Sequence, residues 1–146
     1  MSYENIPAEL KAVKQWVCWD SDKLPKNPYT GKNAQTNNKD TWSDFYTALK
    51  ACEKYKFNGV GFVFDGKKYF GVDLDKCLDN AEFIEEFVET LQSYTEISKS
   101  GNGIHIICRG TLPPGNRRRG SVEMYCERRY FIMTGKLYCD KYRNIV

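Results

Sequence analysis

The sequence contains few of the residues from which metal sites and nucleophilic sites are commonly built. Histidine occurs once, as His105, and the six cysteines are spread over 146 residues without a Cys-x-x-Cys pair. The spacings typical of zinc sites are therefore absent, and no Ser-His-Asp or Cys-His arrangement indicates a protein nucleophile. We expect the cysteines to be reduced thiols packed in the core of a cytosolic protein.

Long apolar runs are also missing. No stretch approaches the roughly 18 consecutive apolar residues that cross a bilayer. Residues 1–11, "MSYENIPAELK", include acids and lack the apolar segment of a secretory signal. The chain has neither an internal repeat nor a low-complexity tract. We therefore expect a single cytoplasmic domain over residues 1–146, with no membrane partner.

Neither sign of charge dominates: 22 basic and 19 acidic residues leave a formal net charge of +3 at pH 7. That value does not by itself indicate a nucleic-acid partner. Basic residues do cluster in "KLPKNPYTGK", "NRRRG" and "ERR", where they are either solvated loop charges or contacts to a phosphate backbone. The candidates for nucleic-acid contact are Lys26, Arg117, Arg118, Arg119 and Arg129.

Short β-rich runs predict most of the strands. "GVGFVF" and "YFGVDLD", joined by the turn "DGKK", predict a β-hairpin over residues 59–75. The other predicted strands are "QWVCWD" (15–20), "IHIICR" (104–109), "SVEMYC" (121–126) and "RYFIMT" (129–134).

Two segments, 41–56 and 80–92, space their apolar residues as helices do. Thr41 and Asp44 resemble a capping box at the start of the first helix. The Pro-, Gly- and Asn-rich segment 21–40 predicts a long loop, and such loops are often functional. This order of elements predicts an α+β fold with a mainly antiparallel sheet.

Polar residues interrupt three of the apolar strands. Asp73 and Asp75 lie two apart in "GVDLD", so strand alternation places them on one face, away from the apolar Val72 and Leu74. His105 in "GIHII" and Glu123 in "SVEMY" have the same kind of apolar flanks. If these strands adjoin, the acids and the histidine converge, and a divalent metal would relieve the repulsion between the carboxylates. Taken singly, each residue is equally compatible with an ordinary structural role.

The loop "SKSGNG" lies directly before the strand that carries His105. Its serines and its Asn102 offer hydrogen bonds, and its glycines allow backbone N–H groups to approach an anion closely. A phosphate site beside a carboxylate-bound metal is suited to phosphoryl or nucleotidyl transfer. A plain hairpin turn is the alternative interpretation.

These motifs resemble those of a known family. Asp-hydrophobic-Asp, then Ser-Gly-x-Gly-x-His, then a hydrophobic residue plus an acid resemble, in that order, the three motifs of the archaeo-eukaryotic primase superfamily. The likeness is strongest to the primase-polymerase domains of phage, plasmid and other mobile-element replication proteins. It covers roughly residues 15 to 135, and "SYTEIS…SGNGIHI" is its most specific part. The fold implied is an RRM-like catalytic core packed against an N-terminal α/β unit.

The resemblance also implies roles for the site residues. Asp73, Asp75 and Glu123 match the catalytic metal ligands, although many members of the superfamily have aspartate at the third position. That difference leaves the metal geometry open.

Nucleotide binding is implied for the second motif. Ser100 and His105 match residues that hold the triphosphate of the incoming nucleotide, and Lys99 and Asn102 are neighbouring candidates.

The activity implied is template-directed nucleotidyl transfer with two Mg²⁺ or Mn²⁺ ions. The implied partners are a single-stranded DNA template, nucleoside triphosphates and a replicative helicase. Such a domain commonly precedes a helicase region, so the chain is either an excised domain or a short protein. Trp16, Trp19 and Tyr29 are either stacking platforms for bases or, for the tryptophans, core residues. A non-catalytic module that binds single-stranded DNA and a metal-dependent nuclease are the alternative functions.

Overall fold

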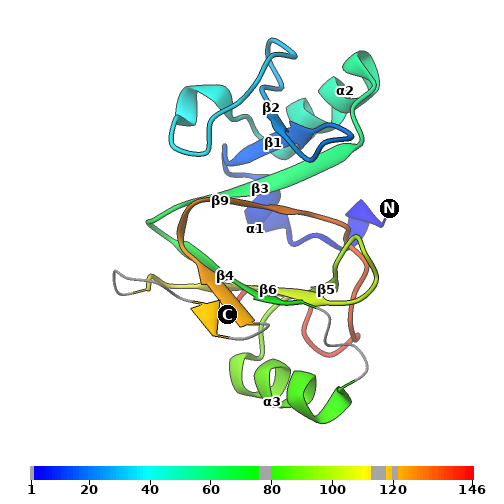
Figure 1. Ribbon diagram of the computed structural model, residues 1–146, viewed down its shortest axis with the longest axis vertical. Coiled ribbons are helices and arrows are strands. Elements are labelled where there is room, and N and C mark those ends of the chain that lie inside the picture. The colour runs from blue at the N-terminus through cyan, green and yellow to red at the C-terminus, as the bar shows by residue number, and fades with distance from the viewer. Residues whose placement is uncertain (1, 76–79, 113–117, 120–121) are drawn as a thin grey trace.

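The computed structural model describes residues 2–75, 80–112, 118–119 and 122–146. These residues form two antiparallel sheets with few helices, which confirms the predicted α+β class (Figure 1). The helices are η1 (Tyr3–Asn5), α1 (Ala8–Lys11), η2 (Lys39–Thr41), α2 (Phe45–Tyr55) and α3 (Ala81–Leu91). The strands are β1 (Trp16–Trp19), β2 (Pro25–Lys26), β3 (Gly59–Asp65), β4 (Tyr69–Leu74), β5 (Thr95–Ile97), β6 (Ile104–Arg109), β7 (Arg118–Arg119), β8 (Val122–Tyr125) and β9 (Glu127–Ile132).

The strands divide between two sheets. Sheet A has the order β2-β1-β3-β9 and sheet B the order β5-β6-β4-β8-β7. The predicted hairpin over residues 59–75 is wrong, because β3 pairs with β1 and β9 whereas β4 pairs with β6 and β8. Residues 59–64 of β3 are buried throughout, so this strand takes a central place in sheet A. The turn after β3 carries the chain to the other sheet.

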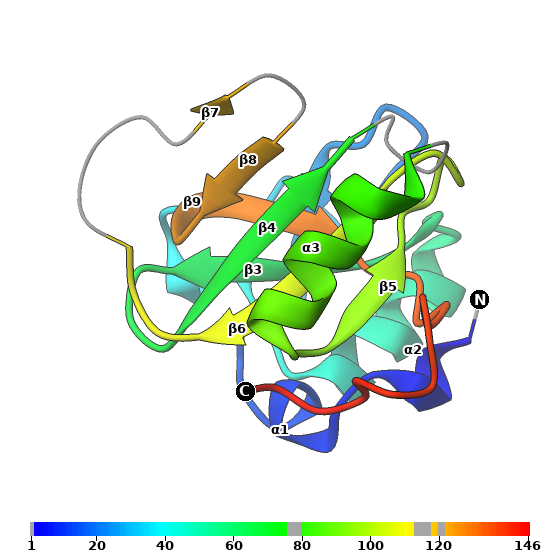
Figure 2. The ribbon, with the colours of Figure 1, turned by 90° about the horizontal axis from the view of Figure 1, so that it is seen from below.

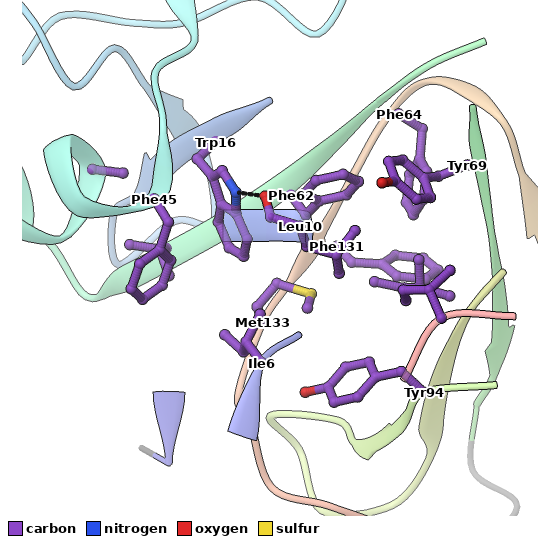
Figure 3. Packing of buried hydrophobic residues seen from close by; sticks show 14 of the residues in the cluster. Ile6, Leu10, Trp16, Phe45, Phe62, Phe64, Tyr69, Tyr94, Phe131 and Met133 are labelled. Atoms are coloured by element: carbon purple, nitrogen blue, oxygen red, sulfur yellow. Dashed lines mark hydrogen bonds between the residues drawn. The ribbon is translucent and has the colours of Figure 1, made fainter. Parts of the chain in front are cut away.

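The two sheets face each other, and α3 covers the far face of sheet B (Figures 1 and 2). Phe62 and Phe64 of β3 pack with Phe131 of β9 and with Tyr69 of β4, so one core joins the sheets (Figure 3). Helix α2 adds Phe45 to the same core. The opposite face of sheet A is covered by the connection between β2 and α2.

Helix α2 begins later than the sequence predicts. Thr41 belongs to η2, and the cap is Asp44, whose Oδ1 accepts a hydrogen bond from the Thr47 N–H at 2.8 Å. An aspartate side chain that reaches the third backbone N–H is a standard N-cap. The capping box that begins at Thr41 is therefore wrong. Asn80 caps α3 in the same way, through the Phe83 N–H at 3.3 Å.

The cysteines partly follow the expectation. The five cysteines that lie in the described ranges are free thiols; Cys18 and Cys108 are buried in the cores, and Cys52, Cys126 and Cys139 are half-buried. Cys77 lies outside the described residues. None of the helices described here has the length and apolar character needed to span a lipid bilayer.

Candidate functional site

Three neighbouring strands of sheet B bring the predicted polar residues into one row. Asp73 on β4 lies directly opposite His105 on β6 on one side and directly opposite Glu123 on β8 on the other. Residues paired in this way have Cα atoms about 4.5–5.5 Å apart and point to the same face of the sheet. The structure therefore gathers three residues that are far apart in the sequence.

The flanking apolar residues determine which face carries this row. Val72 and Leu74 are fully buried against Ile84 and Val88 of α3. Because side chains alternate along a strand, Asp73 faces the other way, toward sheet A. Asp75 follows one residue after the end of β4 and is exposed.

His105 is held between the two sheets. Its ring stacks on Phe131 of β9, with centroids 4.2 Å apart and planes 14° apart, and its Nε2 lies 3.5 Å from Asp73 Oδ1. Burial lowers the pKa of His105 to about 4, although a hydrogen bond with the Ile132 backbone and the Asp75 carboxylate oppose the shift. The imidazole is therefore neutral at pH 7.

Glu123 has a neighbour on its own strand. The Tyr125 hydroxyl donates a hydrogen bond to Glu123 Oε2. Burial, together with that bond, raises the pKa of Tyr125. The Arg129 guanidinium lies over the Tyr125 ring, 5.0 Å from its centroid. Tyr125 therefore contacts both the acidic Glu123 of sheet B and the basic Arg129 of sheet A.

The loop between β5 and β6 borders the row. Ser98 and Ser100 are in hydroxyl contact at 3.2 Å, and Ser100 Oγ accepts a hydrogen bond from the Asn102 N–H at 3.2 Å. Gly101 has a φ of +80° with open space around it, as a tight turn requires. A Cβ on Gly103 would lie 2.4 Å from the Leu74 carbonyl oxygen, so glycine lets this loop lie against the end of β4.

A cavity of about 340 Å³ opens over Asp73 and His105, whereas Glu123 is not among the described residues that line it. Lys23, Lys99 and Arg129 line it together with Asp73 and Asp75, so basic side chains surround an acidic floor. Carboxylates that could hold cations thus lie beside cations that could hold phosphates. The remaining lining residues are Ser98, Ser100, His105, Tyr125, Tyr130, Phe131 and Ile132.

Other predicted residues lie elsewhere. The Lys26 ammonium binds Asn33 Oδ1 at 2.7 Å and Asp20 at 3.4 Å, and neither Lys26 nor Asn102 lines this cavity. Arg117 lies outside the described residues, and Arg118 and Arg119 form the short edge strand β7.

The three aromatic candidates for base stacking differ in their exposure. Trp16 and Trp19 are buried in the core, so they cannot stack on bases, whereas Tyr29 is exposed. The Lys99 ammonium lies over the Trp19 ring, 5.3 Å from its centroid.

The donors of the row are hard carboxylate oxygens, which Mg²⁺ and Mn²⁺ prefer. Among the described residues, however, no three His, Cys, Asp or Glu side chains are gathered closely enough to hold a metal ion. The carboxylates suit these ions chemically, but the described residues do not gather into a metal site, so the binding of Mg²⁺ or Mn²⁺ is a prediction.

No protein-family model matches the chain. A curated protein named DNA primase-polymerase, from Nitratiruptor phage NrS-1, is 33% identical to it over 150 aligned residues. The chain is related to a phage primase-polymerase. The alignment covers 91% of this chain and 21% of the relative, so the chain spans about a fifth of that protein's length.

Sequence reasoning included Lys23 in the basic cluster "KLPKNPYTGK" but did not single it out as a site residue, whereas it lines the cavity. Lys23 has a φ of +61°, and its carbonyl oxygen accepts a hydrogen bond from the Tyr130 hydroxyl at 2.5 Å. Asp20 Oδ1 organises the same turn by accepting from the N–H groups of Asp22 and Leu24. The turn "DSDKLPK", directly after a buried strand, could have drawn attention to Lys23. The sequence around a turn does not show, however, whether that turn faces a functional site.

Proposed function

We propose that this domain catalyses template-directed nucleotidyl transfer, as a DNA primase or polymerase in the replication of a phage or another mobile element. The observation that carries the proposal is the register of sheet B, which pairs Asp73 with both Glu123 and His105. The relationship to a phage primase-polymerase supports it independently. Sheet B with α3 would then be the RRM-like core, and sheet A with α2 the N-terminal unit.

Three acidic residues would hold Mg²⁺ or Mn²⁺: Asp73, Asp75 and Glu123. The chemistry that such ions supply, when bound, is activation of a primer 3′-hydroxyl and neutralisation of charge on the pyrophosphate leaving group. Asp73 and Glu123 support this role because they are direct neighbours across β4 and β8 and share one face of the sheet.

The basic residues and the loop would hold the triphosphate. Lys99 and Arg129 approach the cavity from opposite sheets, and Ser100 adds a hydroxyl. Because His105 is neutral at pH 7, it can donate one hydrogen bond to a phosphate oxygen without adding a charge. Asn102 remains a candidate for nucleotide binding, and Lys26 and Arg117 to Arg119 remain candidates for contacts to the template.

A primer-extension assay tests the proposal. Parent protein, single-stranded template, Mg²⁺ or Mn²⁺ and labelled nucleotides should yield new or lengthened strands. Asp73→Asn should reduce this synthesis by at least about 100-fold, because it removes one charge at the centre of the row. Asp140→Asn is the matched control, since Asp140 is exposed and pairs with Arg143 in the C-terminal segment.

Each other outcome indicates a different function. Shortened template that depends on Asp73 would indicate a nuclease. Retarded template without product would indicate a replication module that only binds DNA. Synthesis that survives in Asp73→Asn would reject this site.

A further inference from the structure

A second cavity adjoins the candidate site. It measures about 620 Å³ and shares Arg129 and Tyr130 with the first cavity. Arg128 also lines it, together with the polar side chains of Gln35 and Asn37, and none of its described lining residues is acidic. The remaining lining residues are Pro25, Ala34 and Thr36. The surface thus changes from mixed charge in the first cavity to basic and neutral polar in the second.

Arg128 owes its position to a β-bulge. Phe64 pairs with Arg129 and Asp65 pairs with Glu127, so Arg128 is an extra residue without a partner across the β3–β9 pair. Its φ of +56° is left-handed, which is rare for a residue with a side chain. Bulges frequently redirect a side chain beside a functional site, and strained residues gather at such sites.

The loop opposite is fastened to this bulge. The Thr36 hydroxyl donates a hydrogen bond to the Arg128 carbonyl oxygen at 3.2 Å. The two walls of the second cavity, residues 34–37 and 128–130, are therefore connected at the bulge. Beyond Arg128 the surface carries both signs of charge again, with Asp40, Asp65 and Glu127 beside Lys39 and Lys67.

We propose that this second cavity binds the phosphodiester backbone of single-stranded nucleic acid and that Arg128 is its main phosphate contact. The proposal rests on the proposed function, which requires a strand to lie next to the nucleotide. A guanidinium forms paired hydrogen bonds with phosphate oxygens, and the neighbouring amides and Tyr130 offer sequence-tolerant contacts to sugars and bases.

The test compares two glycine variants by fluorescence anisotropy with a labelled oligothymidylate. Arg128→Gly removes the guanidinium but suits the left-handed backbone. Lys56→Gly is the matched control, because Lys56 is exposed, has a φ of 58° and lines none of the cavities described here. Lys56 precedes β3, whereas Arg128 lies beside the far end of that strand. Each variant removes one positive charge.

Arg128→Gly should weaken oligothymidylate binding about tenfold. It should also reduce the slope of log affinity against log salt concentration by about one in magnitude. Lys56→Gly should change the affinity less than about twofold. Arg128→Lys should recover part of the loss, since it restores the charge but not the paired geometry. Calorimetric binding of a nucleoside triphosphate with Mn²⁺ should be the same in Arg128→Gly as in the parent.

Equal affinities of Arg128→Gly and Lys56→Gly for the oligonucleotide would overturn the proposal, as would a parent protein that does not bind it. A loss on oligothymidylate without a similar loss on oligouridylate would overturn recognition through phosphate. The two proposals fail separately. If the protein synthesises strands but its affinity for the oligonucleotide does not depend on Arg128, the proposed function holds and this inference fails. If the affinity depends on Arg128 but no strand is synthesised, this inference holds and the proposed function fails.

Discussion

Glu96 on β5 is a fully buried carboxylate that holds the chain segment after β9. Oε1 accepts a hydrogen bond from the Thr134 N–H at 2.9 Å, and Oε2 accepts from the Gly135 N–H at 2.8 Å and from the Tyr94 hydroxyl at 2.6 Å. Glu96 also pairs with His105 in the register of sheet B. Sequence reasoning missed it, because one acid in "YTEIS" resembles an exposed strand residue. Its three donors make it a structural connection between β5 and the segment that follows β9.

Burial raises the pKa of Glu96 from 4.5 to about 7, although its hydrogen bonds favour the ionised form. Between these values the folded protein binds the proton more tightly than the unfolded chain. The contribution of Glu96 to the free energy of unfolding should therefore fall, by about 3 kcal/mol, as the pH rises from 4.5 to 7. Buried His105 acts in the opposite sense from about pH 4 to 6.5, because the unfolded chain then binds its proton more tightly.

Glu96→Gln separates the two groups, since both proteins keep His105. We expect the difference in unfolding free energy, parent minus variant, to shrink by about 3 kcal/mol between pH 4.5 and 7. Urea unfolding at a series of pH values measures it. The exposed Glu86→Gln variant should show no such trend. A difference that grows with pH would contradict the assignment.

At the scale of elements, α2 depends on its cap. Asp44→Ala leaves the Thr47 N–H without its acceptor and should lower the free energy of unfolding by about 1 kcal/mol. Asp44→Asn keeps an acceptor oxygen and should cost less than half as much. Thermal or urea unfolding of both variants measures the difference. An Asp44→Ala variant as stable as the parent would contradict the assignment of Asp44 as the cap of α2.

Local pattern predicted most elements but not their partners. Apolar runs located β1, β3, β4, β6, β8 and β9, and helical spacing located α2 and α3, because these signals lie within a few residues. The short connection at 65–68 also predicted a hairpin, since two strands joined by a turn usually pair. Here the connection crosses between sheets. The short strand β5 was missed because three residues carry too little alternation.

At the scale of the whole molecule, part of the candidate site follows from patterns within single strands, and the rest depends on how the two sheets pack together. Alternation in "GVDLD" and "GIHII" predicted that Asp73 and His105 each point away from their apolar neighbours. That they share a face depended on the two strands being adjacent, which the register of sheet B shows. The opposite wall of the cavity comes from β9 and from the turn that carries Lys23. No pattern in the sequence shows that Phe131 stacks on His105, because that contact depends on how closely the two sheets pack.

Gly71 determines that packing. A Cβ at this position would lie 2.4 Å from Phe131 Cε2 and 2.6 Å from Phe64 Cζ, both in sheet A. Gly71→Ala should therefore push the sheets apart, lower the free energy of unfolding by about 1–3 kcal/mol and weaken nucleotide binding by displacing Phe131 from His105. Urea unfolding and calorimetry with a nucleoside triphosphate measure the two effects.

A double-mutant cycle with Phe131→Leu tests the cause. The smaller side chain makes room for the new methyl group, so the two losses of unfolding free energy should combine to less than their sum by about 1 kcal/mol. Nucleotide affinity should not recover in the double variant, because leucine cannot replace the ring that stacks on His105. Strictly additive losses would show that the alanine is accommodated without moving Phe131, and the site would then not depend on the contact between the sheets at Gly71.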